Sequence, residues 1–123
     1  MKKTFSAFIA EREYNVLDNS TINEMANLSK ESTALPVIIY VSDSRGVNHG
    51  PRIKCNTGYG RWTGQSFTVT IEHEPRVLGK TGDVKSSDAQ TIVDWVKVNY
   101  DALIEYWKME IGVIELGAKL QRI

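Results

Sequence analysis

Apolar residues alternate with polar ones in the first half of the chain and recur every three or four positions in the second half. The cleanest alternation lies in residues 66–72, where Phe67, Val69 and Ile71 share one side, the pattern of a strand with one buried face. Further strands are predicted at residues 35–41, 52–55 and 75–78. Residues 35–41 are almost continuously apolar, which indicates burial on both faces. We therefore expect a small antiparallel sheet of three to four strands.

An amphipathic helix is predicted to cover this sheet. It begins near residues 86–88, a run of favourable N-cap residues. Its apolar stripe recurs at helical spacing and contains Ile92, Trp95, Val96, Tyr100, Leu103, Ile104 and Trp107. Tyr106 lies off the stripe and is expected to be exposed. Residues 99–101 could divide the segment into two helices, and residues 109–123 fit either another strand or a frayed helix.

The chain fits one domain with an N-terminal extension. Its 123 residues, 41% of them hydrophobic, suit one compact core, which we place in residues 34–123. Residues 1–33 are predicted to be a polar arm with short helices. In that arm, Thr21 and Glu24 could form a capping box ahead of a helix over residues 25–28. The expected fold is α+β, with the small sheet packed on the C-terminal helix.

Charge and cysteine content narrow the classes of function. The chain balances 15 basic against 15 acidic residues, which disfavours a membrane-surface protein or a protein that wraps nucleic acid. No segment reaches the roughly 18 to 20 apolar residues of a membrane-spanning helix. The apolar run at residues 5–10 is short and followed by charges, unlike an export signal. A single cysteine, Cys55, excludes an intramolecular disulfide. We therefore predict a cytoplasmic protein.

Few residues could carry catalysis or hold a metal. Cys55 could form a nucleophilic pair with His49 or His73, with neighbouring cations favouring the thiolate. Cys55 shares the apolar phase of Ile53, however, so we interpret it as a small core residue. A structural zinc site normally needs four Cys or His ligands, and the chain has three. No cofactor, metal or catalytic residue is predicted.

The Gly-rich segment at residues 58–64 is superficially similar to a phosphate-binding loop. Its spacing matches neither the dinucleotide fingerprint nor the Walker pattern, and no predicted helix follows it directly. We interpret the segment as a flexible hairpin connection.

The strongest functional signal is a stretch without carboxylates. Residues 44–71 contain no Asp or Glu, although the whole chain is neutral. The candidate partner-binding residues in this stretch are Arg45, Arg52, Lys54, Tyr59, Arg61 and Trp62. Such residues are enriched in protein interfaces, and cations beside aromatic rings also bind unstacked bases. Because so few cations neutralise few phosphates, a protein partner is favoured. The structural alternative is that Tyr59 or Trp62 packs on the sheet while the cations are merely solvated.

A family resemblance rests on five ordered segments: the strand at 37–41, the run at 49–54, the strand at 67–72, the bend at 77–80 and the helical stripe at 92–107. In this order they resemble an uncharacterised bacterial and phage family catalogued as domain of unknown function 4160. The family's second strand carries a Pro-Pro-His-Phe-His-like signature, and here Arg52 and Lys54 replace both histidines. No metal or acid–base role of those histidines is therefore carried over. The resemblance implies an accessory or interaction module, because family members resemble partners in toxin–antitoxin-like gene pairs.

We therefore predict a non-catalytic small module that binds or inhibits a protein, such as a phage or toxin–antitoxin-like accessory protein acting on a host factor. The second hypothesis is a nucleic-acid-binding module that uses the same basic and aromatic residues. The third is a small enzyme that depends on Cys and His.

Overall fold

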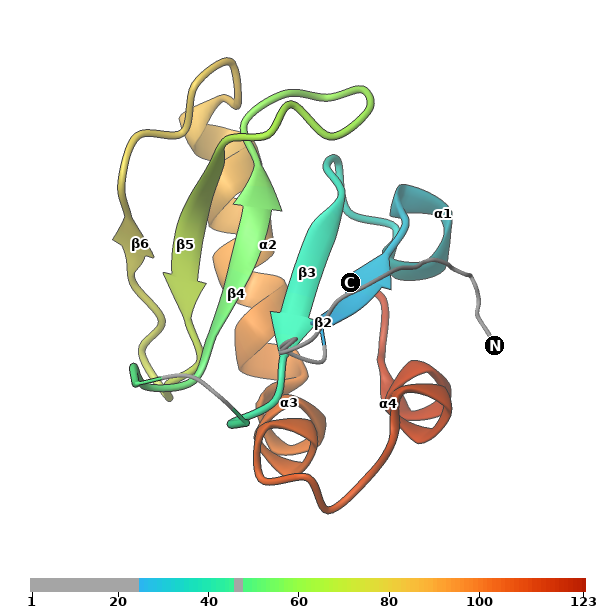
Figure 1. Cartoon of the computed structure of the whole chain (residues 1–123). Coiled ribbons are helices and arrows are strands. Elements are labelled where there is room, and N and C mark those ends of the chain that lie inside the picture. Colours follow the sequence, from blue (N-terminus) through green and yellow to red (C-terminus); the bar gives the residue numbers. More distant parts are fainter. Residues whose placement is uncertain (1–24, 46–47) are drawn as a thin grey trace.

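The computed structural model describes residues 25–45 and 48–123. Its centre is a five-stranded antiparallel sheet in which each strand pairs with its neighbours in chain order (Figure 1). The strands are β2 (Met25–Leu28), β3 (Ile39–Ser42), β4 (Arg52–Asn56), β5 (Ser66–Thr70) and β6 (Val77–Leu78). The predicted α+β class with a small antiparallel sheet is confirmed. The described sheet is wider than the three to four strands expected, and the added strand is β2.

β2 corrects the prediction for the N-terminal arm. Residues 25–28 form a strand, not the helix that Thr21 and Glu24 were expected to cap. β2 pairs antiparallel with β3, and Ala26 and Leu28 are buried. Because a helix of this length is marginal in water, pairing with β3 outweighs a weak local preference for helix. The remainder of the expected arm, up to residue 24, lies outside the described residues.

β3 begins at Ile39, later than the predicted start at residue 35. Pro36 has no N–H to donate to a strand ladder, and the chain bends at residues 36 and 37. The side chains of this segment alternate between fully buried, as for Val37, and partly buried, as for Ile38 and Tyr40. The expected burial on both faces is therefore wrong, because the side that carries Ile38 and Tyr40 is only partly buried.

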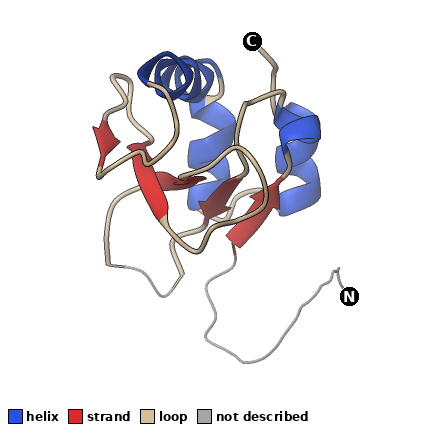
Figure 2. Ribbon diagram, turned by 90° about the horizontal axis from the view of Figure 1, so that it is seen from above, coloured by secondary structure: helices blue, strands red, loops and turns tan. Residues whose placement is uncertain are grey.

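Four helices accompany the sheet in the described part of the chain. They are α1 (Lys30–Thr33), α2 (Ser86–Val98), α3 (Tyr100–Trp107) and α4 (Val113–Lys119). α2 runs behind β4 and β5, and α3 lies at the lower end of the sheet (Figure 1). Seen from above, the strands lie toward one side of the molecule and the helices toward the other (Figure 2). α2 begins at Ser86, as predicted, and α4 confirms the helical alternative for residues 109–123.

Asn99 separates α2 from α3 and anchors the C-terminal tail. Its side chain is 3% exposed. The side-chain amide donates to the carbonyl of Trp95 at 3.0 Å and to the carbonyl of Gln121 at 2.9 Å, and its oxygen accepts from the Gln121 N–H at 2.7 Å. One asparagine thus bonds to the last turn of α2 and fixes a segment far along the chain. The two-helix arrangement, one of two considered for this region, is the one found.

The core lies between the inner face of the sheet and the two helices α2 and α3. Its fully buried side chains include Ile39, Val41, Ile53, Cys55, Val69, Ile92, Trp95, Val96 and Leu103. Cys55 is a core residue, as predicted. Trp107, expected in the core, is only partly buried, whereas Tyr106, expected to be exposed, is 6% exposed. Asn99 has φ −104° and ψ 16°, so a stripe traced through this break misassigns residues beyond it.

Candidate functional site

One face of the sheet is packed on α2 and α3, and no described helix lies over the other (Figures 1 and 2). We call the second side the open face. The strand registers place one row of residues on it: Asn27, Tyr40, Lys54, Thr68 and Leu78. Neighbouring outward positions hold Ser42, Arg52 and Thr70. None of the outward positions within β2 to β6 carries an Asp or Glu. Glu72, just beyond β5, accepts hydrogen bonds from the hydroxyl of Thr70 and from Arg76, so the positive charge of the strands lies at Arg52 and Lys54.

β4 joins two loops at opposite ends of the sheet, which splits the carboxylate-free stretch (Figure 1). The loop that contains Arg45 follows β3 at the lower end, where the Ser44 N–H donates to the Trp107 carbonyl at 2.9 Å. The loop of residues 57–65 lies at the upper end. Arg45 is therefore separated from Arg61, and the six predicted residues do not form a single patch.

Arg45 is paired within its own loop. Its Nη2 lies 2.7 Å from Oδ2 of Asp43, and its backbone N–H donates to Oδ1 of the same carboxylate at 2.9 Å. The Asp43 side chain is only 4% exposed, and a buried carboxylate is costly unless it is paired. A partner would have to compete with Asp43 for this guanidinium, so we leave Arg45 out of the candidate surface.

Trp62 stacks on Tyr40 at the open face. The two ring centroids are 4.5 Å apart and the ring planes are inclined by 29°. Both side chains are partly buried, and burial raises the pKa of the Tyr40 phenol. Tyr40 lies directly opposite Lys54 in the register of β3 and β4. The stack thus places an aromatic pair beside a cation.

Asn56 holds the loop of residues 57–65 in place. The side chain is completely buried, although its position on β4 points outward, because the loop folds back over it. Its amide donates to the carbonyls of Gly58, Gly60 and Arg61 at 3.0, 3.2 and 2.9 Å. Its oxygen accepts from the N–H of Thr63 at 2.9 Å. The Gly-rich segment is therefore a hydrogen-bonded loop rather than the flexible connection expected.

Tyr59 ties this loop to the start of α2. Its hydroxyl donates to Oδ2 of Asp88 at 2.6 Å and accepts from the backbone N–H of Lys85 at 2.9 Å. Lys85 is the N-cap of α2 and supplies no side-chain cap of its own, so the phenol fulfils that role. The bond to Asp88 raises the pKa of Tyr59. Because its hydroxyl is engaged and its ring packs against the core, we assign Tyr59 to the scaffold.

Three cations remain available for a partner. The side chains of Arg52, Lys54 and Arg61 form no ion pair or hydrogen bond with residues 25–45 or 48–123. Lys54 and Arg61 are exposed and Arg52 is partly buried. In contrast, Arg76 donates to the carboxylate of Glu72 at 2.9 Å. The basic-aromatic surface is therefore defined as Tyr40, Arg52, Lys54, Arg61 and Trp62.

The described part of the chain offers few side chains that are suited to catalysis or metal binding. Cys55 is buried on the covered face, and this burial raises the pKa of its thiol. The rings of His49 and His73 contact aromatic side chains of α3, Trp107 at 5.9 Å and Tyr100 at 4.2 Å between centroids. No group of three or more His, Cys, Asp or Glu side chains among the described residues could hold a metal ion. The protonated, buried thiol is a poor nucleophile.

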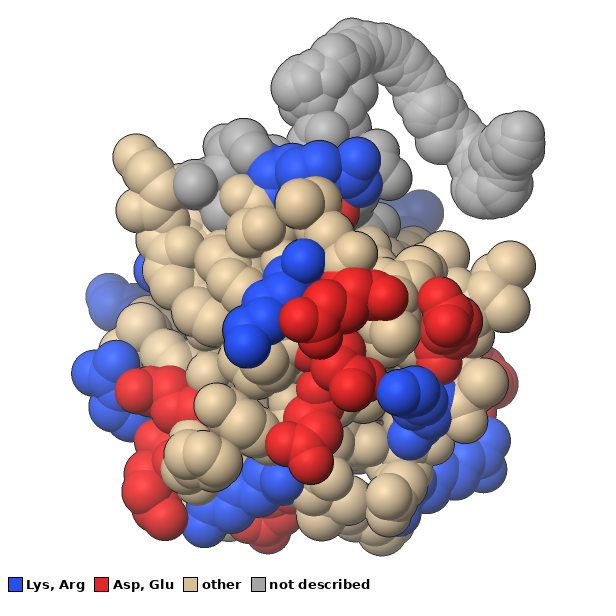
Figure 3. All heavy atoms as spheres, turned by 90° about the horizontal axis from the view of Figure 1, so that it is seen from below, with Lys and Arg blue, Asp and Glu red and all other residues tan. Residues whose placement is uncertain are grey.

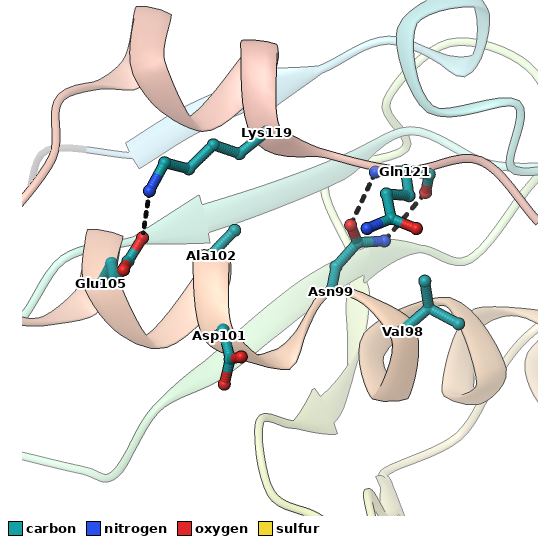
Figure 4. Close-up of a pocket in the computed structure, with 7 residues that line it drawn as sticks. All are labelled: Val98, Asn99, Asp101, Ala102, Glu105, Lys119 and Gln121. Atoms are coloured by element: carbon teal, nitrogen blue, oxygen red, sulfur yellow. Dashed lines mark hydrogen bonds and ion pairs between the residues drawn. The ribbon is translucent and has the colours of Figure 1, made fainter.

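A hollow of about 390 Å³ lies at the junction of α2, α3 and the C-terminal tail (Figure 4). Its lining is Val98, Asn99, Asp101, Ala102, Glu105, Lys119 and Gln121. The Lys119 ammonium donates to Glu105 at 2.8 Å, which raises the pKa of Lys119. Asn99 is bonded to Gln121 across the same hollow. Because these polar groups already pair with one another, we interpret the hollow as the anchor of the tail.

The lower end of the molecule differs in charge from the open face. Figure 3 views this end and shows Asp and Glu side chains gathered near its centre, with Lys and Arg on either side. Such a mixed surface favours neither an acidic nor a basic partner strongly.

Two residues of this site were not predicted from the sequence. Tyr40 was expected within a strand buried on both faces, and Asn56 was not singled out. The sequence could have indicated Tyr40. Side chains alternate between the two faces of a strand, so if residues 39 and 41 face the core, Tyr40 and Ser42 face outward. No local pattern marks Asn56, since its partners are backbone carbonyls supplied by the loop fold.

Comparisons with known protein families, with curated proteins and with solved structures found no match to this chain. The resemblance of residues 36–107 to domain of unknown function 4160 stays a prediction. No helix in the described ranges is long and apolar enough to cross a membrane. Function is therefore inferred from the chemistry of the open face.

Proposed function

We propose that this chain is a non-catalytic module that binds another protein through the basic-aromatic surface. The observation that carries the proposal is the open face itself, which combines unpaired cations with a stacked Tyr40–Trp62 pair and lacks carboxylates on its strands. Arg, Tyr and Trp are the residues that most often dominate protein interfaces. The hydrogen bonds of Asn56 support the proposal, because a loop that is already ordered loses less conformational entropy on binding.

By its resemblance to domain of unknown function 4160, the module would be a phage or toxin–antitoxin-like accessory protein that inhibits a host factor in the cytoplasm. Inhibition requires no chemistry from the module, since covering a working surface of the host factor is sufficient. The buried thiol of Cys55 favours binding over catalysis, because a nucleophile must reach its substrate.

Affinity capture from an extract of the cells that express the chain tests this proposal. The baits are the wild-type protein, the surface variant Lys54→Glu with Trp62→Ala, and the control Lys108→Glu. Lys108 is exposed at the end of α3 and lies outside the basic-aromatic surface. We expect one discrete protein on the wild type and the control and its loss from the surface variant, with all baits folded by circular dichroism. Equal capture by the surface variant would exclude this surface.

A nucleic-acid-binding module is the second candidate, favoured by the aromatic stack beside Lys54. With three cations, the logarithm of the binding constant for single-stranded DNA should fall with the logarithm of salt concentration at a slope of about −2. Fluorescence anisotropy with a thymidine oligonucleotide measures this slope. Binding that Lys54→Glu removes would favour this candidate over the protein partner.

A further inference from the structure

We infer that the basic-aromatic surface recognises an extended segment of its protein partner with the pattern acidic–any–acidic–any–apolar. This inference rests on the proposed function and specifies the chemistry of the partner. Two cations, Arg52 and Lys54, and one aromatic pair, Tyr40 and Trp62, carry it.

The first observation is the spacing of the cations. Arg52 and Lys54 are two residues apart on β4, so both lie on the open face. Side chains two residues apart on a strand are separated by about 6.8 Å. An extended peptide has the same repeat, so carboxylates on alternate residues can meet both cations at once. Adjacent carboxylates cannot, because they point to opposite sides of an extended chain.

The second observation concerns the aromatic pair beside Lys54. The next outward position on β4 is Asn56, which is buried under the loop that holds Trp62. Trp62 stacks on Tyr40, and Tyr40 is the cross-strand partner of Lys54. A peptide that continues along β4 therefore meets an aromatic wall after its second carboxylate. An apolar side chain at that position would cover the ring edges of this wall.

A protein segment fits this surface better than nucleic acid does. Single-stranded nucleic acid is bound by aromatic faces on which successive bases stack. Here one face of Trp62 is already occupied by Tyr40, and both rings are partly buried. The surface therefore offers one stacked aromatic pair, rather than a series of separate ring faces, beside a short row of charge, which suits a side-chain contact.

Two fluorescein-labelled peptides with identical flanks and composition test the inference on the full-length protein. One contains Glu-Ser-Glu-Ser-Leu and the other contains Glu-Glu-Ser-Ser-Leu. Anisotropy titrations at low salt should show about two- to fivefold tighter binding of the alternating peptide, the range expected from the one exposed ion pair that adjacent carboxylates lose. The preference should vanish in Arg52→Gln with Lys54→Gln and persist in the control Lys97→Gln with Lys108→Gln, whose cations lie on the helical side.

Several outcomes would overturn the inference. Equal binding of the two peptides would show that the surface does not distinguish the spacing of the carboxylates. Binding of neither peptide would show that the surface does not recognise the acidic pattern. Loss of preference in the control pair would show that the preference does not depend on Arg52 and Lys54 in particular. A thymidine oligonucleotide that displaces the alternating peptide and binds more tightly would assign the surface to nucleic acid. Capture of a protein through the same surface, despite indistinguishable peptides, would leave the proposed function standing while this inference fails.

Discussion

Asn56 and Thr63 are joined by two hydrogen bonds that end on one oxygen. The Asn56 Oδ1 accepts from the backbone N–H of Thr63 at 2.9 Å and from its hydroxyl at 3.0 Å. The opposite end of the same side chain donates to three loop carbonyls. Both ends of one buried amide thus close the loop that carries Arg61 and Trp62.

Replacing Asn56 by Ala should therefore destabilise the protein strongly. The change leaves several backbone groups of the loop without their partner, and each unsatisfied buried group costs about 1 to 3 kcal/mol. We expect a loss of about 2 to 4 kcal/mol in the free energy of unfolding, measured by urea denaturation. Thr63→Val removes the hydroxyl alone and should cost less. An Asn56→Ala protein as stable as the wild type would show that water replaces the amide.

Leu103 and Ile114 form a matched pair that tests the core. Leu103 on α3 is completely buried, whereas Ile114 on α4 is 86% exposed. Leu103→Ala should lower the free energy of unfolding by about 2 to 5 kcal/mol, because it leaves a cavity. Ile114→Ala should change it by less than about 0.5 kcal/mol. Similar thermal melts for both variants would mean that α3 is not packed as described.

Gly82 and Gly117 should respond in opposite directions to substitution by Ala. A Cβ at Gly82 would lie 2.7 Å from Thr57 Cβ and 2.8 Å from its carbonyl oxygen, and Gly82 has φ +63°. Gly82→Ala should therefore cost more than about 1 kcal/mol. Gly117 lies within α4 with open space around it, so Gly117→Ala should add about 0.5 to 1 kcal/mol. Chemical denaturation compares the two, and a harmless Gly82→Ala would contradict the close approach.

The bond from Tyr59 to Asp88 predicts a pH dependence. That bond raises the pKa of Tyr59 above its ordinary value of 10.0. A proton held more tightly in the folded protein adds stability that is fully present below the unfolded pKa and is lost as pH rises through the folded pKa. Tyr59→Phe should therefore lower the melting temperature at about pH 8, and the difference from wild type should shrink towards about pH 11. Tyr100→Phe is the control, because its hydroxyl bonds to none of the described residues. A difference independent of pH would contradict the assignment.

Periodicity predicted the parts of the fold that depend on burial. Phe67, Val69 and Cys55 were assigned to the buried face from their alternation with polar residues, and all three are buried in the structure. Periodicity did not predict the features that depend on contacts with distant parts of the chain. Residues 25–28 become β2 through pairing with β3. A break at residues 99–101 was one of the two arrangements considered, but the bonds of Asn99 to the distant Gln121 follow from no local pattern. The candidate site was predicted in part for the same reason. Arg52 and Lys54 follow strand parity, whereas the stacking of Trp62 on Tyr40 depends on the path of the loop.

The bonds of Asn56 have a consequence for how this surface can diversify. Asn56 bonds to carbonyls of the loop, and every residue type offers a carbonyl, so the side chains of residues 60 to 62 are not constrained by this interaction. Mutations at Arg61 and Trp62 could therefore change what is recognised while the path of the chain is kept. The loop is in this respect a natural site for a combinatorial library, and a single asparagine would be the residue that such a library must not vary.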